Sequence, residues 1–253
     1  MFNLTARIFN AMKRNIPNLI TLCNLLCGTI AAWQAVMGSL QYAAIFILLG
    51  IFFDFFDGLT ARLLHVASPM GKELDSLADL VTSGVAPGFI LFYVLLRCAD
   101  PSWLAFAALL IPLAAAWRLA KFNLDTRQAS SFLGLPAPAN ALVWASVGFC
   151  FKCPAWTKIA LLPVPGLCNW LFSGVGPVVL ALLAVICSLL MVTELPLFAL
   201  KFKNLKWRDN RVRFIFLIAS ALQLLLFGIV GIPLIIVWYV LLSLFTNKTN
   251  SKQ

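Results

Sequence analysis

The chain has 253 residues, of which 62% are hydrophobic and only 11% are charged, and its mean hydropathy is +0.96. Soluble domains are about 25% charged and 45–50% apolar, so this chain has too little polar surface to cover a water-exposed globule. The composition also excludes a disordered chain, a disulfide scaffold and a basic nucleic-acid module, although the formal net charge is +10. It predicts an integral membrane protein with no nucleic-acid partner.

Apolar runs of about 20 residues, bounded by charge, Pro or Gly, predict eight transmembrane helices. Their ranges are 16–37, 40–64, 74–96, 103–122, 138–160, 174–193, 212–228 and 230–246. We therefore predict an all-α fold, a polytopic membrane helical bundle that forms one domain over residues 16–246. An interfacial amphipathic segment at 1–15 precedes the domain and a tail at 247–253 follows it.

Lysine and arginine are distributed unevenly over the predicted loops. An even number of helices places both termini on one side, together with the loops after the second, fourth and sixth helices. That side receives sixteen of the 19 basic residues, which makes it cytoplasmic by the positive-inside rule. The chain shows no convincing cleavage site after its first apolar run. We expect a bacterial inner (cytoplasmic) membrane protein whose termini face the cytoplasm.

Acidic residues cluster near the junction of the second and third predicted helices. Only nine acidic residues occur in the chain, and five of them lie within positions 54–79. A carboxylate at membrane depth costs roughly 2.5–3.5 kcal/mol, so cationic groups must compensate for the four aspartates of this cluster. These are Asp54, Asp57, Asp75 and Asp79.

The spacing of these aspartates predicts that they converge. Asp54 and Asp57 are separated by three positions and Asp75 and Asp79 by four, so each pair projects from one face of its helix. A turn signal between the pairs lets the two helices return antiparallel. Oxygen ligands without Cys or His favour Mg²⁺, Mn²⁺ or Ca²⁺, bound as one or two ions that also hold phosphate. The alternative is ordinary ion pairing of the aspartates with Arg62 or Lys72.

The cluster matches the pattern D-x2-D-G-x2-A-R-x8-G-x3-D-x3-D. Its eight fixed positions are Asp54, Asp57, Gly58, Ala61, Arg62, Gly71, Asp75 and Asp79. This pattern resembles the signature of the CDP-alcohol phosphotransferases. The resemblance implies a membrane enzyme that displaces CMP from a CDP-linked lipid or alcohol with the help of divalent metal.

Further segments resemble one branch of this family, the CDP-diacylglycerol–serine O-phosphatidyltransferases. They lie at residues 16–28, 71–79, 118–123 and 132–140. The branch implies attack of the L-serine hydroxyl on the phosphatidyl phosphorus of CDP-diacylglycerol, which yields phosphatidylserine and CMP. It also implies a homodimer and a cytoplasmic site that holds two Mg²⁺ or Mn²⁺ ions.

The resemblance also implies roles for individual residues. All four aspartates become metal ligands, and Asp79 becomes in addition the general base that takes the serine hydroxyl proton. The residues implied to contact CDP-diacylglycerol are Asn18, Thr21, Asp57, Gly58, Ala61, Arg62 and Gly71. For Asn18 and Thr21 the alternative is an N-terminal turn and cap of the first helix.

A serine acceptor needs a cation for its carboxylate. Arg118, Lys121 and Arg127 are candidates at the cytoplasmic end of the fourth predicted helix, with Asn123 as a hydrogen-bonding partner. Of these we favour Arg118, Arg127 and Asn123, because an arginine in an apolar run is costly unless it is used.

Two alternative functions stay open from the residues. Glycerol phosphate or inositol phosphate could replace serine as the acceptor, although a phosphorylated acceptor calls for additional cations. A cation transporter would explain buried aspartates, but not the glycines, alanine and arginine that accompany them. Such a transporter would usually show broken helices or inverted repeats, and neither is clear in this sequence.

Overall fold

The computed structural model describes residues 2–66, 68–124, 132–151, 165–197 and 210–250. The α-helices are α1 (Phe2–Val36), α2 (Leu40–Leu64), α3 (Pro69–Asp79), α4 (Ala86–Cys98), α5 (Leu110–Leu124), α6 (Ala137–Cys150), α8 (Pro165–Leu171), α9 (Gly176–Val192), α10 (Arg211–Phe227) and α11 (Ile232–Asn250). Two 3-10 helices, η2 (Ser102–Leu109) and η5 (Gly228–Gly231), lead into α5 and α11, and a π-helix, η1 (Leu80–Val85), joins α3 to α4. The prediction of an all-α membrane bundle is confirmed.

Each of the eight predicted segments contains a helix. Five helical runs of the described chain are long and apolar enough to cross a membrane: Asn15–Val36, Leu40–Leu64, Pro69–Cys98, Ser102–Leu124 and Arg211–Leu244. The helices α6 and α9 are apolar but shorter. The predicted helix at 138–160 ends at Cys150, because Phe151 is extended at its C-cap, and residues 152–160 lie outside the described part of the chain.

Two boundaries differ from the prediction in ways that affect the site. The helix α1 runs without a break from Phe2 to Val36 and contains Pro17, so the basic N-terminal segment continues directly into the first predicted span. The third predicted helix begins at Pro69 rather than at 74 and passes through the π-helical turn η1. Local periodicity does not reveal a π-turn, because the apolar pattern continues through it.

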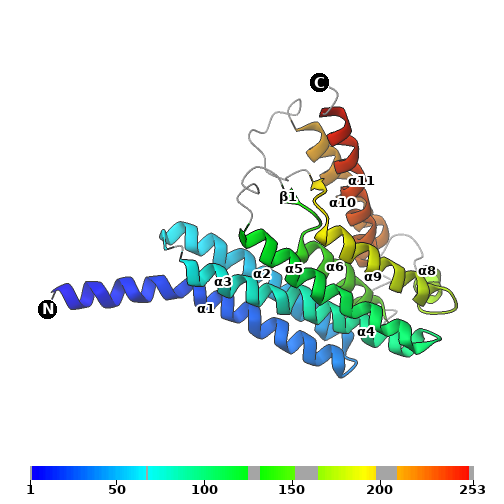
Figure 1. The fold of residues 1–253 in the computed structure, drawn as a ribbon, viewed down its shortest axis with the longest axis horizontal. Coiled ribbons are helices and arrows are strands. Elements are labelled where there is room, and N and C mark those ends of the chain that lie inside the picture. The colour runs from blue at the N-terminus through cyan, green and yellow to red at the C-terminus, as the bar shows by residue number, and fades with distance from the viewer. Residues whose placement is uncertain (1, 67, 125–131, 152–164, 198–209, 251–253) are drawn as a thin grey trace.

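Small residues allow the first helices to pack closely. Ala31 and Ala35 of α1, with Ala43 and Ala44 of α2, are fully buried in the main core. The helix α1 also contacts α3, η1 and α4, whereas α5 packs between η1 and α9. Close approach of this kind is typical of membrane helices. In lipid the helices have no hydrophobic driving force to associate, so they depend on the van der Waals packing that small side chains permit. It brings α1, α2 and α3 together at the end of the bundle where α2 turns into α3 (Figure 1).

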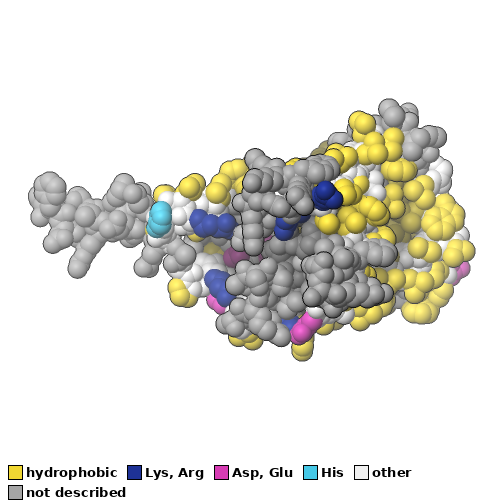
Figure 2. Space-filling model, turned by 90° about the horizontal axis from the view of Figure 1, so that it is seen from above, with side chains coloured by type: hydrophobic (Ala, Val, Ile, Leu, Met, Phe, Trp, Pro, Cys, Tyr) yellow, Lys and Arg dark blue, Asp and Glu magenta, His cyan; other side chains and the backbone are white. Residues whose placement is uncertain are grey.

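The described part of the C-terminal half contains α6, α8 and α9, a two-stranded pairing, and the last two helices. Two short strands, β1 (Phe132–Leu133) and β2 (Pro196–Leu197), pair antiparallel and tie the start of α6 to the end of α9. Beyond them, α10 and α11 lie side by side at a steep angle to the other helices (Figure 1). Seen from above, Lys and Arg side chains gather toward the middle of the molecule, and the end away from the N-terminus is largely hydrophobic (Figure 2).

Candidate active site

A sharp reversal of the chain brings the two aspartate pairs to the same place. His65 ends α2 in the left-handed conformation with φ 55°, and its N–H and that of Val66 donate to carbonyls of the last helical turn. Ser68 then caps α3, because its hydroxyl accepts the N–H of Gly71 at 3.0 Å, and Pro69 occupies the first helical position. The predicted reversal of the chain is therefore built from a left-handed C-cap and a serine N-cap.

Three of the four aspartates converge on one point. Carboxylate oxygens of Asp54, Asp57 and Asp75 all lie within 4.8 Å of one another. Asp57 is buried and the other two are half-buried. Among the described residues, no Lys or Arg forms an ion pair with any of the aspartates, so the alternative that these acids are ordinary ion-pair partners is wrong for this part of the chain.

The donor set of this cluster fits a divalent cation. Oδ1 of Asp75 is buried without a hydrogen-bond partner among the described groups. Carboxylates that share a site without a counter-charge repel one another, and bound hard cations relieve that repulsion. Asp54, Asp57 and Asp75 could therefore hold a metal ion.

Asp79 lies beside this trio rather than within it. Its carboxyl is within hydrogen-bonding reach of Asp54 and interacts electrostatically with Asp75 and Asp57. Its Oδ1 accepts a hydrogen bond of 3.2 Å from the side-chain amide of Asn24 on α1. The fourth predicted ligand, Asp79, thus contacts the cluster and in addition accepts a hydrogen bond from Asn24.

The helix α1 supplies a direct partner to Asp57. The Thr21 hydroxyl lies 2.6 Å from Oδ2 of Asp57 and 3.0 Å from the Pro17 carbonyl oxygen. Asn18 and Thr21 stand well inside α1, which begins at Phe2, so the interpretation of these two residues as a helix cap is wrong. Thr21 instead fixes one carboxylate oxygen of the cluster.

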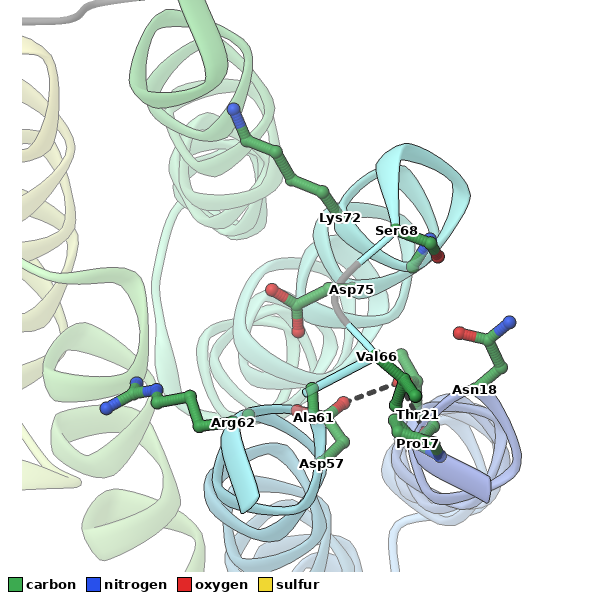
Figure 3. A pocket seen from close by; sticks show the side chains of 12 residues that line it. Pro17, Asn18, Thr21, Asp57, Ala61, Arg62, Val66, Ser68, Lys72 and Asp75 are labelled. Carbon is green, nitrogen blue, oxygen red and sulfur yellow. Dashed lines mark hydrogen bonds between the residues drawn. The ribbon is translucent and has the colours of Figure 1, made fainter. Parts of the chain in front are cut away.

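A cavity of about 260 Å³ opens beside the carboxylates, between α1, α2 and α3 (Figure 3). All seven residues expected to contact CDP-diacylglycerol line it, together with Asp75. The lining consists of Pro17, Asn18, Thr21, Asp57, Gly58, Ala61, Arg62, Val66, Ser68, Gly71, Lys72 and Asp75. The sequence analysis missed Pro17, Val66, Ser68 and Lys72 as lining residues. Pro17 and Lys72 belong to segments that resemble the family, and Val66 and Ser68 lie between Arg62 and Gly71 of the motif.

The two motif glycines shape this cavity differently. A Cβ at Gly71 would lie 3.1 Å from Oδ1 of Asn18, so a side chain there would crowd the facing wall. A Cβ at Gly58 would meet only the Arg62 guanidinium, at 3.9 Å, so this backbone stays open to the cavity. Small residues here leave room for a ligand to approach the main chain.

The two basic residues of the cavity extend away from Asp57 and Asp75 (Figure 3). Lys72 donates to the carbonyl oxygen of Asn123 at 3.0 Å, and the Asn123 amide donates to the Ser76 hydroxyl at 2.9 Å. Arg62 is exposed at the rim. Its charge is therefore available to an anion that enters the cavity, because Arg62 forms no ion pair with any aspartate that the structure describes.

Among the proposed acceptor cations that the structure describes, Arg118 interacts with an aspartate of the cluster. It is only 9% exposed and interacts electrostatically with Asp79 and Tyr239, and its Nε has no hydrogen-bond partner among the described groups. Lys121 instead forms a 2.6 Å ion pair with Glu194. Arg127 lies outside the described residues. The structure thus brings Arg118 to the cluster and ties Asn123 to α3.

Two further residues near the cluster were not predicted as site residues. Asn24 of α1 and Thr82 of η1 are completely buried and hydrogen bonded to each other and, through Asn24, to Asp79. Asn24 belongs to the segment 16–28 that resembles the family, whereas the only sequence signal for Thr82 was a polar residue in an apolar helix.

Comparisons with known proteins agree with this arrangement. The sequence profile of the family described as CDP-alcohol phosphatidyltransferase matches residues 14–175. This range contains every aspartate of the cluster and ends before α9 begins.

Three relatives show how far the similarity extends. A CDP-diacylglycerol–serine O-phosphatidyltransferase of Bacillus subtilis is 38% identical over 137 residues, which cover 54% of this chain and 77% of the relative. The protein of the same name from Saccharomyces cerevisiae is 40% identical over 44% of this chain and 43% of the relative. An archaetidylserine synthase of Methanothermobacter thermautotrophicus is 32% identical over 52% of this chain and 56% of the relative. The chain thus matches about half the length of the yeast and archaeal proteins.

Proposed function

The chain belongs to the CDP-alcohol phosphatidyltransferase family, and on this premise we propose that it transfers the phosphatidyl group of CDP-diacylglycerol to the hydroxyl of L-serine. The products are phosphatidylserine and CMP. The observation that carries the proposal is the convergence of Asp54, Asp57 and Asp75, without a basic partner among the described residues, beside a cavity lined by motif residues.

The cavity suits the nucleotide side of the donor. Arg62 at the rim supplies a guanidinium for the diphosphate, because a planar fork of donors matches phosphate oxygens. Gly58 leaves its backbone accessible to the same group. Asn18 and Thr21 close the cavity on the α1 side, where Thr21 also orients Asp57. These contacts hold the donor with its phosphorus atoms beside the carboxylates.

The four aspartates divide into two tasks in this proposal. Asp54, Asp57 and Asp75 would hold Mg²⁺ or Mn²⁺, and Asp79 would be a further ligand if two ions bind. Divalent ions bound there supply charge neutralisation for the pyrophosphate and for the departing CMP. Asp79 takes the proton of the serine hydroxyl as the new P–O bond forms and the bond between phosphorus and the CMP oxygen breaks.

Serine is favoured as the acceptor for two reasons. Two of the relatives described above are named for serine transfer. Among the side chains that the structure describes, Arg118 is the one buried basic group, and it interacts electrostatically with Asp79. One guanidinium matches the single carboxylate of serine, whereas a phosphorylated alcohol would carry more negative charge to the same place. Asn123, held against Ser76, supplies a further polar group at this end of α5.

The setting of the enzyme is part of the proposal. The distribution of basic residues supports a site and termini on the cytoplasmic side, and the membrane expected for the enzyme is a bacterial inner membrane. We expect a homodimer, which size-exclusion chromatography with light scattering on detergent-solubilised protein will show directly.

One assay tests the reaction and the acceptor together. Purified protein receives CDP-diacylglycerol, Mg²⁺ or Mn²⁺ and radiolabelled L-serine, and both labelled lipid and released CMP are measured. We expect equal amounts of the two products and no turnover with EDTA. Parallel reactions contain glycerol phosphate or inositol phosphate instead of serine. CMP release only with one of these alcohols would overturn serine and keep the reaction class, and no CMP with any acceptor would overturn both.

A further inference from the structure

A buried hydrogen-bond chain leads from Asp79 into the core of the bundle. The Asn24 amide nitrogen donates to Oδ1 of Asp79 at 3.2 Å. The Thr82 hydroxyl lies 2.7 Å from Oδ1 of Asn24 and 3.1 Å from the Asn24 carbonyl oxygen. Both Asn24 and Thr82 are 0% exposed, and neither lines the cavity.

The chemistry of the groups fixes the direction of this chain. An ionised carboxylate only accepts hydrogen bonds, so the Asn24 side chain must turn its NH₂ group toward Asp79. Its amide oxygen then faces Thr82, whose hydroxyl must donate. The carboxylate of Asp79 and the hydroxyl of Thr82 are thus satisfied by the same orientation of the Asn24 amide, and Thr82 stabilises that orientation. Without the hydroxyl, the buried amide oxygen of Asn24 loses its side-chain donor, which is costly in an apolar core.

The surrounding helices are shaped to admit this pair. A Cβ at Gly28 would lie 2.8 Å from the Thr82 backbone nitrogen, and a Cβ at Gly50 would lie 2.9 Å from the Asn24 amide oxygen. The absence of side chains at Gly28 of α1 and Gly50 of α2 thus leaves room for Thr82 of η1 to reach Asn24. Thr82 belongs to the π-helical turn η1, where the N–H of Ala86 donates to the Val81 carbonyl oxygen. Turns of this kind change the direction of the residues that they carry and often occur at functional sites.

We propose that Asn24 and Thr82 are positioning residues that fix which carboxylate oxygen Asp79 presents to the acceptor alcohol. Asn24 donates to Oδ1 and this chain of hydrogen bonds supplies no donor to Oδ2, so the acceptor proton is assigned to Oδ2. This explains why Asp79 stands beside the trio of Asp54, Asp57 and Asp75 instead of within it. The inference rests on the proposed phosphatidyl transfer.

The proposal makes a specific kinetic expectation. Because Asn24 and Thr82 do not line the cavity, their loss leaves the binding of CDP-diacylglycerol intact. Because Asp54, Asp57 and Asp75 keep their own positions, the ion that these three would hold stays bound. What falls is kcat, by about 10–100-fold, which is typical when an outer partner of a functional carboxylate is removed.

The first test compares three threonine variants in the phosphatidyl-transfer assay. Thr82→Val keeps the shape of the side chain and removes the hydroxyl, and Thr82→Ser keeps the hydroxyl. Thr29→Val is the matched control, because Thr29 is an exposed helical threonine whose hydroxyl donates only to the Leu25 carbonyl oxygen at 2.8 Å. We expect the kcat loss in Thr82→Val alone, with the KM for CDP-diacylglycerol within twofold of wild type and with recovery in Thr82→Ser.

A second measurement separates positioning from collapse of the site. Mn²⁺ binding followed by electron paramagnetic resonance reports on the three clustered aspartates without turnover. We expect wild-type Mn²⁺ affinity in Thr82→Val. The same result is expected for Asn24→Leu, which removes the amide itself and replaces Thr82→Val as the test if that variant does not fold. Loss of Mn²⁺ affinity, or a kcat of Thr82→Val within twofold of wild type, would overturn the proposal.

The proposed function and this inference can fail separately. If the wild-type enzyme releases CMP only with another alcohol, the comparison of Thr82→Val with Thr82→Ser is repeated with that acceptor. A loss and recovery of kcat there would sustain the positioning role although serine had failed as the acceptor. Equal kcat values in all three threonine variants would overturn the positioning role whatever the acceptor.

Discussion

Two regions of the molecule are apolar but packed very differently. One is formed by the helices that carry the site, and the other is the C-terminal hairpin formed by α10 and α11. In the apolar window of the run Pro69–Cys98, 56% of the residues are buried, against 11% in Arg211–Leu244. The buried residues of the first run include Thr82, Ser83, Gly84 and Gly88, which are polar or small. The hairpin instead presents large residues such as Leu225, which is 65% exposed. Apolar composition accounts for membrane insertion in both regions, whereas buried polar and small residues mark the region that performs chemistry.

The boundary of the family match follows the same division. The profile match ends at residue 175, so it covers the site helices and α6 and stops before α9, α10 and α11. The predictions below therefore contrast substitutions in the site helices with substitutions elsewhere in the chain.

The largest effect is expected from Asp57→Asn. The substitution removes the charge of the one fully buried member of the carboxylate trio, so turnover should fall by more than about 100-fold, beyond the usual loss for an outer partner. CMP release per amount of membrane-inserted protein measures the effect. Asp100→Asn, an exposed acid after α4, is the matched control and should keep wild-type turnover. Near-normal turnover of Asp57→Asn would show that these carboxylates are not the metal site.

The next largest effect is expected from Gly28→Ala. An added Cβ would lie 2.8 Å from the backbone nitrogen of Thr82, and a helix backbone cannot yield as a flexible side chain can. Overpacking of this kind costs about 1–3 kcal/mol, so both the thermal midpoint in detergent and kcat should fall. Gly166→Ala in α8 is the control, because its Cβ would meet nothing within 4 Å. Equal thermal midpoints for the two variants would contradict the packing described for α1 and η1.

A more selective effect is expected from Arg118→Ala. Hydrogen bonds to charged groups contribute about 1.5–3 kcal/mol, so the KM for serine should rise by roughly 10-fold or more, and the KM for CDP-diacylglycerol should change less. Lys121→Ala is the comparison, because Lys121 is already paired with Glu194. An unchanged serine KM in Arg118→Ala would remove this arginine from the acceptor site.

The smallest effect is expected from Leu225→Ala in the C-terminal hairpin. The side chain is 65% exposed in α10, outside the region that matches the family. Substitutions at such positions usually change stability by no more than about 0.5 kcal/mol, so kcat and the thermal midpoint should stay close to wild type. A loss as large as that of Gly28→Ala would show that the hairpin is energetically coupled to the site.

The sequence predicted the aspartate cluster because fixed spacing on two helices, joined by a turn, restricts where the side chains can lie. The resemblance to the family also implied the seven donor-contact residues that line the cavity. It could not show Asn24 and Thr82 as a pair, because their contact joins α1 to a π-helical turn 58 positions later. The interpretation of Asn18 and Thr21 as a helix cap failed for a related reason, since nothing local showed that α1 continues upstream through Pro17.

The separation of Asp79 from the other three aspartates was likewise not predictable. Spacing of four positions places Asp75 and Asp79 on one face of α3 but does not decide which of the two carboxylates also accepts a hydrogen bond from α1. That difference depends on Asn24, which reaches Asp79 from the neighbouring helix. Tertiary contacts between helices, rather than local pattern, distinguish the carboxylate trio from its neighbour.

Binding of Mn²⁺ to purified protein tests the central claim most directly, because the claim concerns what compensates the carboxylates of Asp54, Asp57 and Asp75. Electron paramagnetic resonance titrations of wild type and of the single Asn variants at these positions require neither substrate nor turnover. The account predicts saturable Mn²⁺ binding in wild type and at least about tenfold weaker binding in each variant. Unchanged binding in all three variants, or no saturable binding in wild type, would contradict it.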